Sequence, residues 1–217
     1  MIPLRDTIPS ARVPVVNYAV IAANVLVFLH EVSLGRRAEA FIFTYGLVPR
    51  HFALPNLLTS MFVHGGWAHL LGNMLFLYIF GDNIEDRLGH LRYLVFYLLC
   101  GAAAGAAQSV LNASSGVPMV GASGAIAGVL GAYLLFFPTA RVVTLVPIFF
   151  FLQLVEIPAV FFLAVWFLWQ VLSGVASFGD RSSMGGVAFW AHVGGFLSGM
   201  ALGPALRARD APRARWA

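Results

Sequence analysis

Apolar residues form long stretches in this chain, separated by short polar connections. A helix needs about 20 apolar residues to cross a hydrocarbon core of about 30 Å. On that basis we predict six membrane-spanning helices, at residues 15–29, 67–80, 93–110, 123–137, 157–175 and 187–206. The second and fourth are short, which is possible where protein rather than lipid surrounds the start of a helix. The pattern therefore predicts an all-α polytopic membrane protein, built as a bundle of six transmembrane helices.

Two further apolar stretches do not fit a spanning helix. Residues 142–155 are too few for a span and contain Pro147, so we predict a segment that lies at the membrane interface and leads into the fifth helix. The first connection, residues 31–55, is long and carries aromatic residues such as Phe41 and Tyr45. This composition favours a segment at the interface over a free loop.

Composition supports a membrane protein. The chain has 217 residues, of which 60% are hydrophobic and 10% are charged. A soluble domain averages about 25% charged residues, so lipid is expected to cover most of this surface. We expect residues 1–217 to form one domain, with a short N-terminal segment at 1–13 and an arginine-rich tail at 207–217. Cys100 is the only cysteine, so an internal disulfide is excluded.

The positive charge indicates orientation in the bilayer rather than a nucleic-acid partner. The net charge of +4 rests on arginine alone, and the arginines lie in short connections and near the ends of the chain. With six spans, both termini lie on one side of the membrane. That side collects Arg5, Arg12, Arg87, Arg92, Arg141, Arg207, Arg209, Arg213 and Arg215. The other side collects Arg36, Arg37, Arg50 and Arg181. Because arginine accumulates on the cytoplasmic side, both termini are predicted to be cytoplasmic.

Ser123 lies in the motif Gly121-Ala122-Ser123-Gly124, at the predicted start of the fourth helix. The flanking glycines allow a tight turn and leave the hydroxyl uncrowded. A helix N-terminus also offers free N–H groups and a partial positive charge, which suit an oxyanion developing on a substrate carbonyl. The alternative is a serine N-cap followed by glycines that permit close helix packing.

His192 is the only histidine in the last two predicted spans. Its helix carries Gly195 and Gly199 four residues apart, and the fourth helix carries Gly124 and Gly128 with the same spacing. Two such glycine faces can approach closely. The histidine would then lie within hydrogen-bond reach of the serine and could activate it by taking its proton. Because no carboxylate has a suitable position for a third member, we predict a Ser–His dyad.

His69 and Asn73 are four residues apart in the second predicted helix, so their side chains share one face. Polar side chains in a membrane helix are costly and need a polar destination. They can bond to neighbouring helices and hold the bundle together, or they can face a polar site. His64 lies nearer the outer end and can be an interfacial residue.

In combination these motifs resemble the rhomboid family of intramembrane serine proteases, in its bacterial six-span form. Each motif is weak alone, but the three in this order are specific, and the resemblance covers nearly the whole chain. The matching residues are His64-x4-His69-x3-Asn73, Gly121-x-Ser123-Gly124 and Ala191-His192-Val193-Gly194.

The resemblance implies a role for each matching residue. Ser123 would be the nucleophile and His192 the general base. His69 and Asn73, with the backbone N–H of Ser123, would stabilise the oxyanion. Supporting positions would be His64, Gly121 and Gly124. The resemblance further implies an enzyme without a cofactor or metal, which cleaves transmembrane protein substrates near the outer face of the bacterial inner membrane.

The chain departs from the family pattern at two places. Some relatives have an aromatic residue four positions after the serine, where it packs on the histidine ring. Here that position is Ala127, and we expect Phe189 or Trp190 to supply the packing. Many relatives carry a Trp-Arg pair in the first connection, whereas this chain has Val48-Pro49-Arg50 and no tryptophan there.

Two other functions compete with this interpretation. A non-catalytic relative that binds and retains membrane proteins typically lacks the serine or the histidine, and both are present here. A small transporter with a site at the bilayer midplane would show inverted repeats and broken helices in matching positions. The sequence shows neither, so the protease is the favoured hypothesis.

Overall fold

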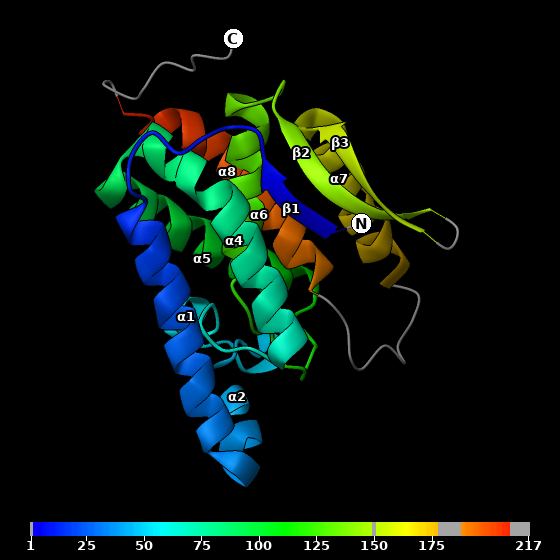
Figure 1. Cartoon of the computed structure of the whole chain (residues 1–217). Helices are drawn as coiled ribbons and strands as arrows, with labels where there is room; N and C mark the ends of the chain where they lie inside the picture. The colour runs from blue at the N-terminus through cyan, green and yellow to red at the C-terminus, as the bar shows by residue number, and fades with distance from the viewer. Residues whose placement is uncertain (1, 149–150, 178–187, 209–217) are drawn as a thin grey trace.

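The computed structural model describes residues 2–148, 151–177 and 188–208, and it is mostly helical. Arg181 and the tail beyond residue 208, which entered the charge argument, lie outside the described residues. Figure 1 shows the arrangement of the elements. In chain order these are β1 (Ile2–Asp6), α1 (Val15–Ser33), η1 (Gly35–Arg37), α2 (Ala38–Tyr45), η2 (Pro49–His51), α3 (Asn56–Thr59), α4 (Trp67–Leu88), α5 (His90–Leu111), α6 (Ser123–Phe136), β2 (Arg141–Ile148), β3 (Phe151–Pro158), α7 (Ala159–Ser177) and α8 (Phe189–Leu206).

A helix occupies each of the six predicted segments, but the helices differ in length from the prediction. Among the described helices, α1, α5 and α7 are long and apolar enough to cross a membrane, and α6 is apolar but shorter. α4 and α5 are joined by Gly89 alone, with φ of 78°. Only glycine adopts such a conformation readily, which allows one helix to follow the other directly.

The last turns of α4 are polar, and their side chains bind the start of α1 and the residues before it. The Glu85 carboxylate accepts the N–H groups of Val16 at 3.0 Å and Asn17 at 2.7 Å. Asp86 accepts the N–H of Ala11 at 2.6 Å. The first N–H groups of a helix have no acceptor within that helix. The end of α4 therefore caps α1, a role that the hydrophobic pattern alone did not reveal.

A three-stranded antiparallel sheet corrects the all-α prediction. Strands β2 and β3 pair antiparallel, so the described residues of the predicted segment, 142–148 and 151–155, are strand rather than a simple interfacial segment. Strand β1 lies within the predicted N-terminal segment 1–13 and pairs with β2, with Ile2 opposite Leu145. Residues 142–146 are rich in β-branched side chains, which favour a strand. Their partner β1 lies far away in the sequence, near the N-terminus, and a local pattern does not reveal this pairing.

One side-chain contact ties this sheet to the helices. The Tyr133 hydroxyl in α6 donates a hydrogen bond to the Asp6 carboxyl group in β1. The pKa of Asp6 is raised to about 7, mainly by burial; the hydrogen bond from Tyr133 lowers this pKa and the nearby Asp82 raises it. Near neutral pH the folded state thus holds this carboxyl group partly protonated.

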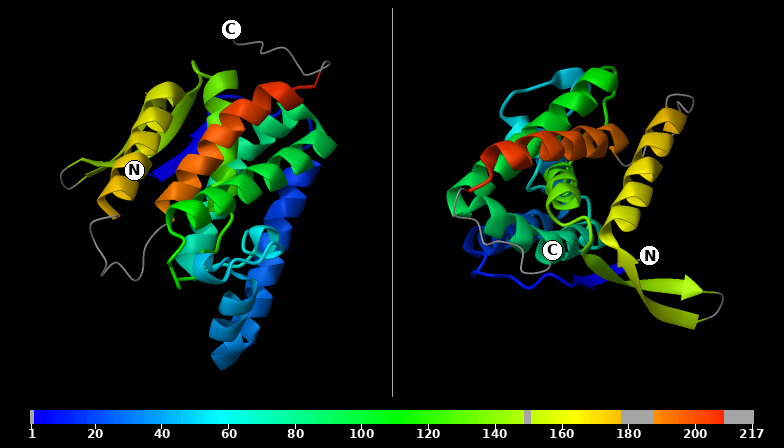
Figure 2. Two further views of the ribbon diagram at one scale, coloured as in Figure 1. Left: turned by 180° about the vertical axis from the view of Figure 1, so that it is seen from behind. Right: turned by 90° about the horizontal axis from the view of Figure 1, so that it is seen from above.

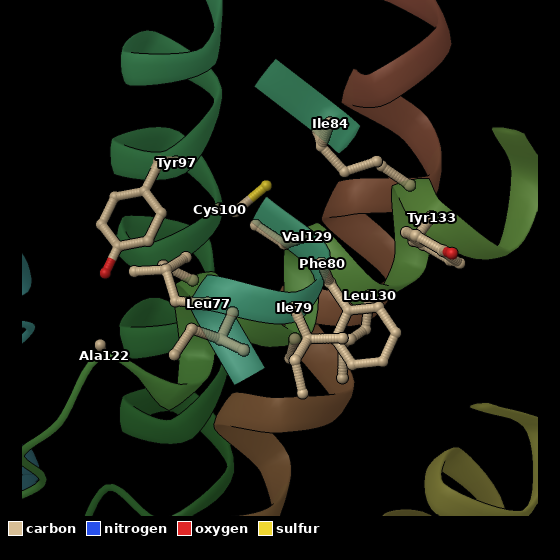
Figure 3. Packing of buried hydrophobic residues seen from close by; sticks show 14 of the residues in the cluster. Leu77, Ile79, Phe80, Ile84, Tyr97, Cys100, Ala122, Val129, Leu130 and Tyr133 are labelled. Atoms are coloured by element: carbon tan, nitrogen blue, oxygen red, sulfur yellow. The ribbon is translucent and has the colours of Figure 1, made fainter. Parts of the chain in front are cut away.

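α6 lies in the middle of the helices when the molecule is viewed from above (Figure 2). Every residue from Gly124 to Tyr133 is buried. The neighbouring helices enclose α6 on several sides, so Ser123 stands at the start of a helix with little freedom to move. Figure 3 shows part of this core, with side chains that include Leu77, Phe80 and Ile84 of α4, Tyr97 and Cys100 of α5, and Val129, Leu130 and Tyr133 of α6.

Candidate active site

Ser123 and His192 are in direct contact. Ser123 Oγ lies 2.8 Å from Nε2 of His192. Ser123 begins α6, and His192 is buried in α8. At that separation an imidazole nitrogen can take the hydroxyl proton. The pair has the geometry of a nucleophile and its base.

The hydroxyl of Ser123 does not cap its own helix. The N-cap of α6 is Ala122, no side-chain capping bond is present there, and the Ser123 hydroxyl faces His192 instead. The N-cap alternative is therefore wrong. The backbone N–H of Ser123 is one of the first in α6, where the N–H groups have no acceptor within the helix and negative charge is favoured.

The turn that leads to Ser123 is held by the segment between α1 and α4. Gly121 has φ of 111°, a conformation that residues with a side chain rarely adopt. Its N–H donates to the carbonyl of Ser60 at 2.9 Å. Two residues earlier, Met119 pairs with Leu47 through two backbone hydrogen bonds of 2.9 and 2.8 Å. The segment between α1 and α4 thus fixes the loop that precedes Ser123.

α6 and α8 approach until their backbones touch, as the glycine spacing predicted. A Cβ atom added at Gly199 would lie 1.9 Å from the carbonyl oxygen of Gly128. One added at Gly195 would lie 2.0 Å from the carbonyl oxygen of Gly124. Gly124 also faces Ala104 of α5, whose Cβ would lie 2.6 Å from an added Cβ. This contact brings the histidine of α8 to the serine of α6.

His69 and Asn73 lie on the face of α4 that meets Gly121. A Cβ atom at Gly121 would lie 2.6 Å from Nε2 of His69 and 3.3 Å from Nδ2 of Asn73. Nδ2 of Asn73 is buried and has no hydrogen-bond partner within the described part of the chain. Buried donors are nearly always bonded, so this amide is available for an acceptor that a substrate brings. Interhelical bonding, the alternative for Asn73, is not seen among the described residues.

His64 lies behind His69 rather than at an interface. It is fully buried, and its ring centroid is 5.2 Å from that of His69 in an edge-on arrangement. Its backbone N–H donates to Glu31 of α1 at 3.2 Å. Burial lowers the pKa of His64 to about 4, with a smaller effect from the neighbouring His69. His64 is therefore neutral near pH 7 and packs against one of the two predicted oxyanion donors.

Two residues of α7 contact His192 and were missed by the sequence analysis. Oε1 of Gln170 lies 2.8 Å from Nδ1 of His192. The Trp166 ring lies 5.8 Å from the imidazole, centroid to centroid, at 37°. This ring contact was expected from Phe189 or Trp190, but the structure shows it from Trp166. One feature of the sequence could have indicated these two residues. Gln170 is a polar residue in an apolar helix, and it lies four residues after Trp166, on the same helical face.

These side chains line one cavity of about 720 Å³. Its walls include Ser123, His192, His69, Asn73 and Trp166. Within the described ranges, no group of three or more His, Cys, Asp or Glu residues could hold a metal ion. The cavity brings together a hydroxyl in contact with an imidazole and an amide donor that has no partner among the described residues. This arrangement is compatible with acyl transfer.

Residues 51–209 match the family model of the Rhomboid domain. The matched range contains all the predicted site residues and covers most of the chain. This chain belongs to the rhomboid family. The resemblance inferred from the three motifs is thereby confirmed. Family membership and the apolar helices together make this rhomboid an integral membrane protein.

Several curated proteins are similar to this rhomboid. RHOMBOID-like protein 4 of Arabidopsis thaliana is 35% identical over 154 residues, which are 68% of this chain and 33% of that protein. Rhomboid protease GluP of Bacillus subtilis is 35% identical over 126 residues, which are 56% of this chain and 24% of that protein. Presenilin-associated rhomboid-like protein, mitochondrial, of Mus musculus is 34% identical over 136 residues, which are 61% of this chain and 36% of that protein. This rhomboid spans less than half the length of the curated relatives it matches.

Proposed function

We propose that this rhomboid is an intramembrane serine endopeptidase with Ser123 as nucleophile and His192 as general base. The observation that carries the proposal is the 2.8 Å contact between Ser123 Oγ and Nε2 of His192. Membership of the rhomboid family supports the same activity, as does the similarity to a relative named as a rhomboid protease.

The proposed reaction is an acyl transfer in two halves. Ser123 Oγ attacks the carbonyl carbon of the scissile peptide bond while its proton passes to Nε2 of His192. The imidazolium gives that proton to the leaving amine as the C–N bond breaks, and the acyl group remains on the serine. Water then attacks the acyl-enzyme with His192 as base. The carboxylic acid product leaves and the serine hydroxyl is restored.

The negative oxygen of the tetrahedral intermediate needs donors that are already in place. We assign this role to Asn73 and His69, whose Nδ2 and Nε2 atoms converge beside Gly121. The backbone N–H of Ser123 supplies a third donor at the helix N-terminus. The unpartnered state of the Asn73 amide supports its assignment, because an oxyanion would provide the missing acceptor.

The proposed substrates are transmembrane proteins, cut near the outer membrane face. A peptide bond within a helix is protected by the hydrogen bonds of the helix. The substrate must therefore unwind locally, which favours small or helix-breaking residues near the cut. We further propose one domain over residues 1–217, six spans and cytoplasmic termini in a bacterial inner membrane. The unequal distribution of arginine supports this orientation.

The test of the proposal compares the wild-type chain with Ser123→Ala, in liposomes with a generic transmembrane substrate. We expect wild type to cleave and Ser123→Ala to be inactive with an unchanged melting temperature. A fluorophosphonate probe should label wild type, with the adduct on Ser123 by mass spectrometry. Ser198→Ala is the matched control, because its hydroxyl bonds to the Gly194 carbonyl within α8 and does not line the cavity.

Ser198→Ala should therefore keep wild-type cleavage and labelling. An adduct on another serine, or full activity in Ser123→Ala, would overturn the assignment of the nucleophile. A wild-type protein that binds the substrate but neither cleaves it nor reacts with the probe would instead be a non-catalytic member of the family.

A further inference from the structure

Both ring nitrogens of His192 are occupied. Nε2 faces the Ser123 hydroxyl and Nδ1 faces Oε1 of Gln170, each at 2.8 Å. A neutral imidazole carries one proton, so one of its nitrogens donates and the other accepts. Nε2 can accept the serine proton only if the ring proton is on Nδ1. The carbonyl oxygen of Gln170 can only accept a hydrogen bond, and it therefore stabilises that tautomer.

We infer that Gln170 is a positioning residue that holds His192 with its proton on Nδ1 and its Nε2 directed at Ser123. This inference rests on the proposed function, and it makes the active unit a chain of three side chains from α6, α8 and α7. The geometry corresponds to that of a triad in which an uncharged amide replaces the usual carboxylate. When the imidazolium forms, the amide oxygen still accepts the Nδ1 proton.

The packing of α7 directs Gln170 toward α8. Gln170 is 6% exposed, whereas its neighbour Trp169 is 66% exposed. One turn before it, Trp166 packs on the His192 ring. One turn after it, a Cβ atom added at Gly174 would lie 3.1 Å from the Trp190 ring. Three successive turns of α7 thus contact α8, and the amide lies between two close contacts that limit its movement.

An amide suits this position better than a carboxylate would in lipid. An ionised carboxylate in a buried membrane site is costly unless it is fully paired. The amide oxygen accepts the same hydrogen bond without burying a charge. The amide can stabilise the developing imidazolium only as a dipole, so its effect on rate should be smaller than that of a triad aspartate. A glutamine does not stand out in the sequence when the expected third member is an acid.

The experiment uses the full chain in liposomes and compares Gln170→Met with Gln170→Glu. Gln170→Met keeps the size of the side chain but removes the acceptor. We expect kcat to fall about 10- to 10³-fold, less than the roughly 10⁴-fold loss when a triad aspartate is changed. KM and the melting temperature should stay near wild type. Leu172→Met, on the lipid-facing side of α7 and 57% exposed, is the matched control and should keep wild-type kcat.

Gln170→Glu provides a readout that a merely structural role would not change. A carboxylate at this position favours the charged imidazolium, so the neutral base persists only at higher pH. Activity should be largely retained, and the acid limb of the kcat/KM profile should move to higher pH. Among the described residues no Asp, Glu or Arg lines the cavity, and His69 is its other titratable group. His69 is the same in every variant and does not affect the comparison.

The tautomer can be measured without turnover. Nitrogen-15 spectra of histidine-labelled protein, assigned with His192→Ala, should show the Nδ1–H form in wild type and a mixture in Gln170→Met. Wild-type kcat and tautomer in Gln170→Met, or an acid limb that stays in place in Gln170→Glu, would overturn the inference. Failure of Ser123 labelling in wild type would overturn the protease proposal alone, because the spectra still report the role of Gln170.

Discussion

Gly121 determines how closely the turn before the serine can approach the two predicted oxyanion donors. A Cβ atom here would lie 2.6 Å from the His69 ring, which is closer than real contacts allow. The residue also has a positive φ of 111°. The available space and the backbone conformation therefore both require glycine at this position. Because no side chain intervenes, the predicted donors of α4 can lie within reach of a substrate carbonyl held at Ser123.

The donor role of Asn73 predicts a specific kinetic change. Loss of one oxyanion donor typically lowers kcat about 10²–10³-fold. In Asn73→Ala the ring of His69 and the backbone N–H remain, so we expect a loss at or below the lower end of that range, with a smaller rise in KM. Leu71→Ala, on the same helix but 61% exposed, should leave both constants unchanged. Steady-state kinetics distinguish an oxyanion donor from a substrate-positioning residue, because a change in KM alone would mean that Asn73 positions the substrate.

Local spacing explains which site residues could be predicted from the sequence. Ser123 and His192 stand out because each is a polar residue beside glycines in an apolar stretch, and His69 and Asn73 share a helical face. Gln170 carries no such motif. Its importance depends on how α7 packs against α8, which is a tertiary contact that spacing within one helix does not contain.

At the scale of elements, α6 and α8 bring Ser123 and His192 together because their backbones touch. The glycine spacing predicted this contact, since small residues at every fourth position mark a helix face that permits close approach. The sheet was not predicted. Strand β2 has a β-branched sequence, but in a chain so rich in apolar residues this composition also fits an interfacial segment. Its pairing with β1 joins the N-terminal segment to the connection between α6 and α7 and has no local signal.

The contact between α6 and α8 makes Gly199→Val a sensitive substitution. The added Cβ would lie 1.9 Å from a backbone oxygen and 2.6 Å from the Cα atom of Gly128, so the helices must separate. A displacement of about 1 Å can lower the rate on the order of 10²-fold. We expect cleavage and probe labelling to collapse although no residue of the dyad has changed. Ala201→Val introduces the same side chain on the exposed side of α8 and is the control.

Cross-linking tests whether separation of α6 and α8 causes the expected loss of activity in Gly199→Val. Cysteine pairs placed on the facing surfaces of α6 and α8, in a Cys100→Ala background, should cross-link in the otherwise wild-type chain and less well with Gly199→Val. Full activity in Gly199→Val would contradict the close-packing account even if Ser123 and His192 are correctly assigned.

The whole molecule has two chemically different ends. At one end Ala208 donates its N–H to the Arg87 carbonyl at 3.0 Å, and Arg92 donates to the Arg207 carbonyl at 3.3 Å. The first connection and the loop before the serine meet at the opposite end of α4. α4 runs between these two ends, and its polar last turns lie at the arginine-rich end. We therefore expect the arginine-rich end and the serine loop to face opposite sides of a bilayer, as the distribution of arginine predicts.

This separation predicts which surface sites are accessible from outside the cell. Cys100 is buried, and Cys100→Ala provides a cysteine-free background. In that background we introduce Glu39→Cys in α2 or Arg5→Cys in β1, both at exposed positions. Because arginine accumulates on the cytoplasmic side, a membrane-impermeant maleimide should label Glu39→Cys in intact spheroplasts. It should label Arg5→Cys only after the membrane is permeabilised. Both variants should be labelled equally in detergent, which controls for the reactivity of each cysteine. The reverse pattern would place the serine loop on the cytoplasmic side, and substrates would then be cut near the inner face.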